Sequence, residues 1–548
     1  MCSSSGDFSQ DGHLGTPHTN KTFHTSVLPT PVKVDILTKL LTDYDNKDSL
    51  IHGFTFGFKI PSTIQFDPPK NGYTNHKSTD VHHDTVQAKL DKELALGRIA
   101  GPFESPPFQN MICSPLGIVP KKSPGEYRLI HDLSFPPNNS VNSHIDSIHS
   151  SVQYEVLDNC VEIIQQIGGG CLISKADLKD AFRIIPVEPA SYRLLGFQWL
   201  GQYFYDRCLP MGCATSCQTF ESLSQALQWV LIHKLGVLYT SHILDDFIFF
   251  GHPSTNECRI FLNTFLSLAK QVGLPIKESK TVHPSTVVVL HGIQVDTVKM
   301  QLSLPSDKVE AARVAVSALC TKKKVQLNTL QSVIGTLNFA CRVVVPGRAF
   351  LRRLQDLTKG VNHPLHFIRL NSEARKDLAA WKVFLESFNG RFICLPNRWT
   401  SSNSIRLFSD ASGAGFAAIC GSNWLQGQFP SSWTHVNIAI KELLPIVLSI
   451  RMWGDKLSNS RILFMTDNES VVHIVNSQTS KDSTLMQLVR QLVISTMSHN
   501  IHFRAKHLPG KHNVIADLLS RFQETKAFTL APWLKKVPET IPEEWFPW

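Results

Sequence analysis

The chain has 548 residues, 42% of them hydrophobic and 18% charged, which excludes an extensively disordered protein and predicts about three or four domains. No apolar run is long enough to span a bilayer, and residues 1–20 lack the apolar core of a signal peptide, so we expect an intracellular protein, cytoplasmic, nuclear or both, with no membrane partner. The net charge of +9 is mild for this length, but the basic residues are unevenly distributed.

The N-terminal part of the chain divides by composition. Residues 1–30 are rich in Ser, Thr, His and Gly, which predicts a disordered tail. Residues 31–90 mix short apolar runs with Pro and Asn, and we interpret them as a partly folded N-terminal extension. Strand-like and helix-like stretches alternate over residues 91–304, which is the pattern of an α/β or α+β domain.

Acidic residues end the predicted strands of this domain. Residues 171–177 predict a strand that ends in Asp177, and residues 237–251 predict two apolar strands that meet at Asp245 and Asp246. Adjacent carboxylates at a hairpin tip repel each other, so this arrangement is expected where divalent ions neutralise their charge. Two Mg²⁺ ions can clamp the attacking and leaving oxygens of phosphoryl transfer. The alternative is a solvent-exposed acidic turn.

The next segment, residues 306–388, is predicted to be helical because apolar residues recur at intervals of three and four. Residues 311–360 hold nine Lys or Arg and a single acid, Asp356. A concentrated basic surface favours a polyanion as partner, and nucleic acid is the usual one. A pair of solvated basic helices is the alternative.

Residues 401–522 again alternate strands with helices, after a predicted linker at residues 396–403. Four acids lie at strand ends or within helices of this part: Asp410, Glu442, Asp467 and Asp517. One acid in such a place is usually only a helix cap, but four can converge on one pair of metal ions. Asp517 lies near the start of a last predicted helix, and residues 523–548 form a tail that contains Pro and Trp.

Six segments resemble reverse transcriptases, and they occur in the order of that family. The segments are SPLGIVPKKSPGEYRLIHDLS (114–134), ADLKDAF (176–182), LPMGCATSC (209–217), ILDDF (243–247), GLPIKESKT (273–281) and VLHGIQV (289–295). They correspond to the fingers motif, motifs A to D and the primer-grip hairpin. The resemblance implies a right-hand polymerase of fingers, palm and thumb, with residues 91–304 as fingers and palm.

The resemblance also implies roles for single residues. Asp177, Asp245 and Asp246 would hold two Mg²⁺ or Mn²⁺ ions, and the remaining positions would contact substrate. Lys121 and Arg128 would contact the triphosphate, and Phe182 would exclude a ribose 2′-hydroxyl. Met211, Gly212 and Ser216 would lie beside the nucleotide and the template. Lys280 would protonate pyrophosphate. The alternative for Phe182 is a core aromatic.

Two features of these motifs need separate interpretation. The family pattern Tyr-x-Asp-Asp is Ile243-Leu244-Asp245-Asp246 here, and the missing aromatic contacts substrate or primer but no metal. We therefore expect altered fidelity or processivity and intact chemistry. Three cysteines lie in or beside motif B, at 208, 213 and 217, without the spacing of a zinc site, so we expect small, reduced, buried thiols.

Residues 404–521 resemble a retroelement ribonuclease H, a mixed-sheet α/β domain. The resemblance implies that Asp410, Glu442, Asp467 and Asp517 hold a second pair of Mg²⁺ or Mn²⁺ ions. His507, in HLPGKHN, corresponds to a histidine of a mobile loop that helps the product leave. Residues 305–400 would then be thumb and connection, and their nucleic-acid-binding candidates are Arg342, Arg348, Arg352 and Arg353.

The Ile-Leu-Asp-Asp form and residues 329–354 are most similar to DIRS-type retrotransposons, whose members encode a tyrosine recombinase, which we expect as a further partner. The expected function is RNA-directed DNA synthesis with ribonuclease H activity. Its partners would be an RNA template, a DNA primer, the RNA–DNA hybrid and dNTPs. The alternative is a decayed or domesticated copy that binds nucleic acid without catalysis, although all seven acids are present.

Overall fold

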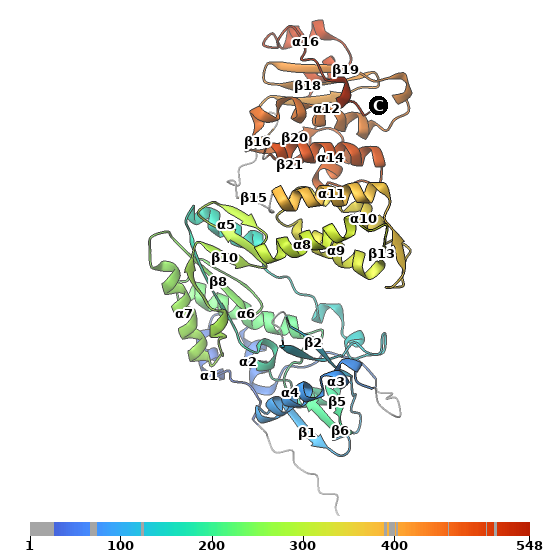
Figure 1. Ribbon diagram of the computed structural model, residues 1–548. Helices are drawn as coiled ribbons and strands as arrows, with labels where there is room; N and C mark the ends of the chain where they lie inside the picture. Colours follow the sequence, from blue (N-terminus) through green and yellow to red (C-terminus); the bar gives the residue numbers. More distant parts are fainter. Residues whose placement is uncertain are drawn as a thin grey trace, which may run out of the picture.

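The computed structural model describes residues 27–65, 74–121, 125–387, 392–393, 400–401, 404–458, 460–499, 501–508 and 512–547. Three parts follow one another along the molecule, with the N-terminal strands and helices at one end, a helical segment in the middle and a second sheet domain at the other end (Figure 1). The predicted tail up to residue 26 and most of the linker at 396–403 lie outside the described residues. Among the described residues, no helix is both long and apolar enough to cross a membrane.

A four-stranded antiparallel sheet, in the order β7-β8-β4-β9, is the centre of the N-terminal part. Its strands are β4 (Leu172–Asp177), β7 (Thr240–Ile243), β8 (Asp246–Gly251) and β9 (Val282–Ser285). Helices α5 (Leu157–Ile167), α6 (Ser216–His233) and α7 (Glu257–Val272) pack around it. The predicted strand ends at Asp177 and at the Asp245–Asp246 hairpin are confirmed.

Strand β8 explains why its sequence is a continuous apolar run. Phe247 and Phe249 pack into the core on the side of α6 and α7, whereas Ile248 and Phe250 pack into the core that contains α5. A strand that is buried on both faces has no polar side to alternate with. The sheet is therefore held between two cores, and its end at the acidic hairpin is fixed from both faces.

The N-terminal extension and the fingers pack onto this palm sheet and its helices. The helices are α1 (Val34–Leu40), α2 (Lys47–Phe56), α3 (Lys77–Val81) and α4 (His83–Ala95). One sheet joins β1 (Ile99–Phe103), β6 (Gln202–Asp206) and β5 (Gly196–Trp199), and β2 (Leu116–Pro120) pairs with β3 (Tyr127–His131). Residues 27–30, which we assigned to the tail, are bonded to the palm, because Thr30 donates to Ile184 O at 2.7 Å and Arg207 to Val27 O at 3.1 Å.

The middle part is mainly helical, as predicted, and begins after the strands β10 (Val287–Leu290), β11 (Ile293–Asp296) and β12 (Gln301–Ser303). Its helices are α8 (Ser306–Cys320), α9 (Leu327–Ala340), α10 (Arg352–Asp356) and α11 (Ser372–Ser387). A short strand pair, β13 (Lys324–Gln326) with β14 (Phe367–Arg369), and a 3₁₀ segment, Val345–Phe350, interrupt the helices. These interruptions follow no helical periodicity and were not predicted.

The C-terminal part contains two three-stranded sheets, one antiparallel and one parallel, with helices packed against them. Strands β17 (Leu407–Ala411), β18 (Gly415–Cys420) and β19 (Asn423–Gln428) are antiparallel, while β16 (Thr400–Ser401), β20 (Arg461–Thr466) and β21 (His502–His507) are parallel. The helices are α12 (Ile438–Trp453), α13 (Glu469–Ser477), α14 (Ser483–Ser498), α15 (Val514–Ser520) and α16 (Glu524–Leu530). Helix α15 carries Asp517 but is not the last helix, because α16 follows it.

The segment after residue 522 is part of this domain rather than a free tail. The Trp424 indole donates to Lys535 O at 2.8 Å, and the Trp453 indole donates to the Glu539 carboxylate at 3.0 Å. Leu534 and Ile541 are buried. The C-terminal residues up to 547 therefore cover apolar surface of α12 and of the antiparallel strands.

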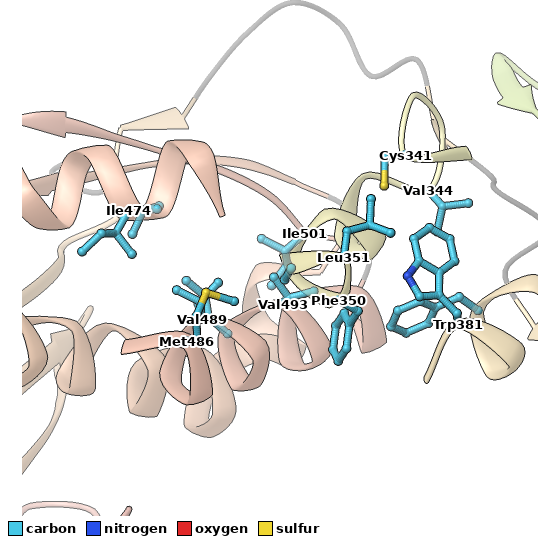
Figure 2. Close-up of a cluster of buried hydrophobic side chains, with 14 of the residues drawn as sticks. Cys341, Val344, Phe350, Leu351, Trp381, Ile474, Met486, Val489, Val493 and Ile501 are labelled. Atoms are coloured by element: carbon cyan, nitrogen blue, oxygen red, sulfur yellow. The ribbon is translucent and has the colours of Figure 1, made fainter. Parts of the chain in front are cut away.

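The middle part and the C-terminal domain share one continuous apolar core (Figure 2). Phe350 and Leu351, which precede α10, pack against the face of α14 that carries Val489 and Val493. Trp381 of α11 is completely buried beside Phe350 and Phe384. Within the described residues, these two parts therefore form one packed unit.

Candidate active sites

Three carboxylates meet at the end of the palm sheet. The pairing of β4 with β8 places Asp177 directly opposite Asp246, and Asp245 precedes Asp246 in the two-residue turn between β7 and β8. The turn is held to the end of β4 because Leu178 N–H donates to Asp245 O at 2.9 Å. All three acids therefore lie together at the same end of the sheet, as predicted.

The electrostatics of this cluster are those of acids that lack sufficient positive charge. Burial, followed by the neighbouring Asp177 and Asp246, raises the pKa of Asp245 to about 6. Burial also raises the pKa of Asp246, whose Oδ1 is buried and has no hydrogen-bond partner among the described residues. Cations favour the ionised form of such a site, so it is suited to divalent ions.

Two lysines partly neutralise the cluster. Lys280 donates a hydrogen bond to the carboxylate of Asp177, and Lys175 Nζ lies 3.7 Å from Asp246 Oδ2. Lys280 was predicted to lie near the substrate, whereas Lys175 was not singled out. Within the described ranges, no three His, Cys, Asp or Glu side chains form a ready-made metal cage. The oxygen donors and the unpaired Asp246 Oδ1 nevertheless fit hard ions such as Mg²⁺.

The loop of motif B lies against the fingers hairpin. Gly212 has a φ of +126°, and a Cβ there would lie 2.0 Å from His131 O, so only glycine fits. Met211 O accepts from His131 N–H at 3.2 Å, and Ser216 Oγ donates to Pro210 O at 3.0 Å. The loop is thus fixed to β3 on one side and to the start of α6 on the other.

The remaining substrate candidates lie in the turn after β4 and on the hairpin of β2 and β3. Phe182 is half-buried in a 3₁₀ turn, Ala181–Ile184, with its ring edge-on to Phe220 at 5.8 Å between centroids. Arg128 is exposed on β3, and Lys121, just after β2, forms an exposed ion pair of 3.3 Å with Glu126. The two basic residues are therefore available to a ligand.

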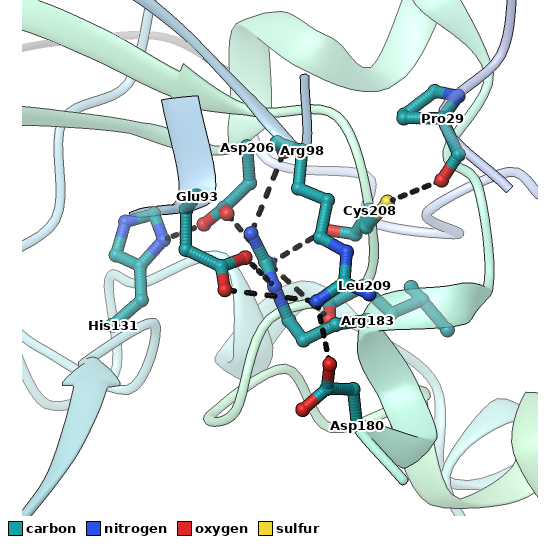
Figure 3. Close-up of polar contacts among 9 residues, drawn as sticks. All are labelled: Pro29, Glu93, Arg98, His131, Asp180, Arg183, Asp206, Cys208 and Leu209. Atoms are coloured by element: carbon teal, nitrogen blue, oxygen red, sulfur yellow. Dashed lines mark hydrogen bonds and ion pairs between the residues drawn. The ribbon is translucent and has the colours of Figure 1, made fainter. Parts of the chain in front are cut away.

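A buried ionic network, which we did not predict, supports the turn that carries Phe182 (Figure 3). Arg183 donates to Asp206 at 2.7 Å and to Glu93 at 2.8 Å, and Asp206 also bonds the His131 ring at 2.9 Å. Burial would raise the pKa of Asp206, but Arg183 and His131 hold it below its usual value. Arg98 bonds Asp180, whose φ is +62°, at 3.0 Å.

Four acids gather in the C-terminal domain. Burial first, then the nearby Asp410 and Asp467, raises the pKa of Glu442 to about 9. Burial raises the pKa of Asp410 to about 6, although Ser520 donates to this carboxylate at 2.7 Å. Asp517 contributes to the field at Glu442 and pairs with Arg521 at 2.8 Å. The structure therefore brings the four predicted acids within one electrostatic site.

His507 lies at the end of β21, next to this group. It is exposed and pairs in register with Thr466, the residue before Asp467. The residues of its loop at 509–511 lie outside the described residues.

The comparisons with known proteins bear first on the palm. A family model described as reverse transcriptase (RNA-dependent DNA polymerase) matches residues 119–309, which include both sides of the first carboxylate cluster. The chain contains a reverse transcriptase domain. The right-hand polymerase fold expected from the motifs is therefore confirmed, and an additional mixed α/β domain follows it.

Relatives of the reverse transcriptase domain occur in polyproteins of viruses and transposons. The genome polyprotein of Petunia vein clearing virus is 22% identical over 67% of this chain and 16% of its own length. The Gag-Pol polyprotein of avian reticuloendotheliosis virus is 26% identical over 54% of this chain and 24% of its own, and the Tf2-3 polyprotein of Schizosaccharomyces pombe is 22% identical over 74% and 29%. The chain thus spans less than a third of the length of each.

A solved structure of the foamy viral protease-reverse transcriptase in complex with double-stranded DNA has a TM-score of 0.50 to this chain. The sequences are 16% identical, and the match covers 86% of this chain and 81% of the other. This likeness bears on the fold, and it extends beyond the family match into the middle and C-terminal parts.

The arginines of the basic segment that follows the reverse transcriptase domain divide into two groups. Arg342 and Arg348 are exposed. Arg352 pairs with Asp356 at 3.1 Å, and Arg353 pairs with Glu373 at 2.7 Å and Asp377 at 3.3 Å. Arg342 and Arg348 are therefore the better candidates for phosphate contacts, whereas Arg353 belongs to an internal ion cluster.

The three cysteines in or beside motif B carry free thiols. Cys208 and Cys213 are buried and Cys217 is half-buried, and all three are free thiols, as predicted. Burial raises the pKa of Cys213 to about 11 and that of Cys208 to about 12, so both stay protonated at neutral pH.

Proposed function

We propose that this protein is an RNA-directed DNA polymerase with ribonuclease H activity, which copies a retroelement RNA into DNA and degrades the RNA of the resulting hybrid. The observation that carries the proposal is the placement of Asp177 opposite Asp246, with Asp245 in the adjoining turn, inside the reverse transcriptase domain. Hydrolysis or transfer at phosphorus needs concentrated positive charge, and the carboxylates of this site can bind the cations that supply it.

At the polymerase site, Asp177, Asp245 and Asp246 would hold two Mg²⁺ or Mn²⁺ ions. When bound, the ions supply Lewis acidity at the phosphoryl oxygens and stabilise the attacking 3′-hydroxyl in its ionised form. Lys280 lies at Asp177 and can give a proton to the departing pyrophosphate, and Lys121 and Arg128 offset triphosphate charge from the fingers. Phe182 restricts the space beside the sugar and thereby selects dNTPs.

At the nuclease site, Asp410, Glu442, Asp467 and Asp517 would hold a second ion pair. Two features support this proposal: Asp410 is the last residue but one of β17, and the pKa of Glu442 is raised to about 9. Buried carboxylates this close together repel one another when they are ionised, and bound cations reduce that repulsion. His507, exposed beside Asp467, would assist release of the cleaved strand.

The proposed partners are an RNA template, a DNA primer, their hybrid and dNTPs. The foamy viral relative was solved with double-stranded DNA, which supports a nucleic-acid duplex as ligand. We further propose an intracellular protein, cytoplasmic, nuclear or both, from a DIRS-type element that also encodes a recombinase. The ILDDF motif supports this finer placement.

A second function, nucleic-acid binding without catalysis, predicts a different outcome in one experiment. Purified protein is incubated with poly(rA)/oligo(dT), labelled dTTP and Mg²⁺ or Mn²⁺, and extension of the primer is followed. The proposed function predicts extension that EDTA abolishes and that the Asp245→Asn variant lacks. A protein that binds the duplex but extends it with neither ion would instead be a binding protein.

A further inference from the structure

Helix α6 lies along the free edge of β7, the strand that leads into the Asp245–Asp246 turn. Strand β7 is an edge strand in the order β7-β8-β4-β9, so half of its backbone groups have no neighbouring strand. Unpaired backbone groups at a buried edge are costly and need other partners. One face of α6 supplies such partners: Gln228 donates to Thr240 O of β7, and Glu221 and Ser224 bond the backbone of Leu244, in the turn that follows β7.

Two of these side chains hold the same residue, Leu244. The Glu221 carboxylate accepts from Leu244 N–H at 3.3 Å, and Ser224 Oγ donates to Leu244 O at 2.8 Å. Leu244 is the first residue of the two-residue turn and has a φ of +51°. A leucine in this left-handed region is strained, so the turn keeps its shape only where neighbours hold it.

The upstream side of the turn is held in the same way. His242 Nε2 lies 3.0 Å from Glu221 Oε1, and His242 N–H donates to Glu155 at 3.3 Å. His242 Nδ1 is buried and has no hydrogen-bond partner in the described part of the chain, so the contact with Glu221 is the one that holds this ring. Glu221 is 3% exposed and His242 1%. Glu221 therefore ties together two residues of the segment that ends in Asp245.

We infer that Glu221 and Ser224 are positioning residues for the Asp245–Asp246 pair: they clamp the Leu244 peptide in its strained conformation and thereby fix both carboxylates against Asp177. This inference rests on the proposed polymerase function. It assigns a role to α6 that is independent of direct contact with substrate, because neither residue is exposed. Loss of the clamp lets the turn relax, so the three acids no longer share one geometry.

The test uses four variants of the full chain: Ser224→Ala, Glu221→Gln, Ser222→Ala and the double variant Ser224→Ala with Leu244→Gly. Ser222 is the matched control, because its hydroxyl lies on the same helix but donates to Thr219 O at 2.7 Å within that helix. The first readout is hydrogen exchange in the peptide that contains Leu244, measured without metal. We expect at least tenfold faster exchange in Ser224→Ala and Glu221→Gln and wild-type exchange in Ser222→Ala.

The second readout is the Mg²⁺ dependence of dTTP incorporation. Ser224→Ala and Glu221→Gln should raise the half-saturating Mg²⁺ concentration by at least threefold and lower kcat, with unchanged affinity for primer–template. Cleavage of a preformed hybrid, which uses a separate site in the same chain, should stay at the wild-type rate. Adding Leu244→Gly to Ser224→Ala should restore much of the loss, because glycine adopts a positive φ without strain.

The possible outcomes distinguish failure of the clamp from failure of the proposed polymerase function. If Ser224→Ala and Glu221→Gln match Ser222→Ala in hydrogen exchange and in Mg²⁺ dependence, the clamp is refuted while the polymerase function stands. Loss of hybrid cleavage together with polymerisation would show a general folding defect and would also refute a specific positioning role. A wild-type protein that never extends a primer would overturn the proposed function, and hydrogen exchange would still decide whether the clamp exists.

Discussion

Arg490 of α14 donates a hydrogen bond to Asp377 of α11 at 3.1 Å, and this ion pair joins the C-terminal domain to the helical segment before it. Both side chains are buried, and Arg353 adds a second cation at 3.3 Å from Asp377. Burial outweighs the arginines and raises the pKa of Asp377 to about 6. The pair therefore lies within the apolar contact of Phe350 and Leu351 with α14, and it specifies how the two parts pack.

Arg490→Met should lower the free energy of unfolding by about 3 kcal/mol at neutral pH, because Asp377 keeps a buried charge with one cation fewer. Since the folded-state pKa of Asp377 lies above its ordinary value, the group is protonated, and needs no cation, below pH about 6. The deficit should thus shrink as the pH falls from 7 to 5. Urea unfolding monitored by tryptophan fluorescence measures it.

The double variant Asp377→Leu with Arg490→Met is the matching control. It should recover most of the lost stability, since no uncompensated charge remains. Equal losses in the single and double variants would show that packing of the arginine stem, and not charge pairing, explains the effect.

Phe182→Val should keep most dTTP incorporation and sharply raise UTP incorporation. The ring is half-buried in the turn that Arg183 anchors, so a smaller side chain opens space on the substrate side. If Phe182 serves only the core, the cavity costs about 2–4 kcal/mol of stability and both substrates suffer together. The ratio of kcat/KM for dTTP and UTP on one template separates the two cases.

Arg342→Ala combined with Arg348→Ala should weaken hybrid binding of any sequence, because both side chains are exposed. The slope of log K against log salt should flatten by up to about 0.9 for each phosphate that the protein no longer neutralises. Arg353→Ala should leave that slope unchanged and lower stability instead, since Arg353 pairs with Glu373 and Asp377. If Arg353→Ala flattens the slope and the double variant does not, the nucleic acid binds on the side of α10 that carries Arg353, and the assignment is wrong.

Removal of residues 523–548 should destabilise the C-terminal domain, because it uncovers Trp424 and Trp453 and deletes the buried Leu534 and Ile541. Hybrid cleavage and the thermal stability of this domain should fall, while primer extension persists. Normal cleavage by the shortened chain would show that this segment is not needed for the stability of the domain.

The acids of both candidate sites could be predicted because they lie near the ends of apolar strands or within helices that the sequence reveals, in surroundings that resemble known motifs. The strand of Asp177 ends at that residue, as predicted, whereas the strand of Asp410 runs one residue further, to Ala411. Asn437 caps the helix that carries Glu442, because its side-chain oxygen accepts from Ala439 N–H. Local periodicity and local capping suffice for such features. The seven acids were therefore accessible without tertiary structure.

Contacts between distant charges could not be predicted in this way. Glu93, Arg183 and Asp206 converge from three separate segments, and nothing in their local sequence reveals which charges will be buried together. The same holds for Arg353, which looked like a phosphate contact in a basic segment and is instead bonded to acids of α11. The last segment seemed a tail because Pro and short apolar stretches carry no periodicity, yet it packs on the domain.

The central claim is that one chain carries two separate metal-dependent sites. The most direct measurement compares Asp245→Asn and Asp467→Asn in parallel assays of primer extension and of cleavage of a preformed RNA–DNA hybrid. We predict that Asp245→Asn abolishes extension and retains cleavage, and that Asp467→Asn does the reverse, with both variants folded and hybrid-bound. Loss of both activities in either folded variant would contradict the account.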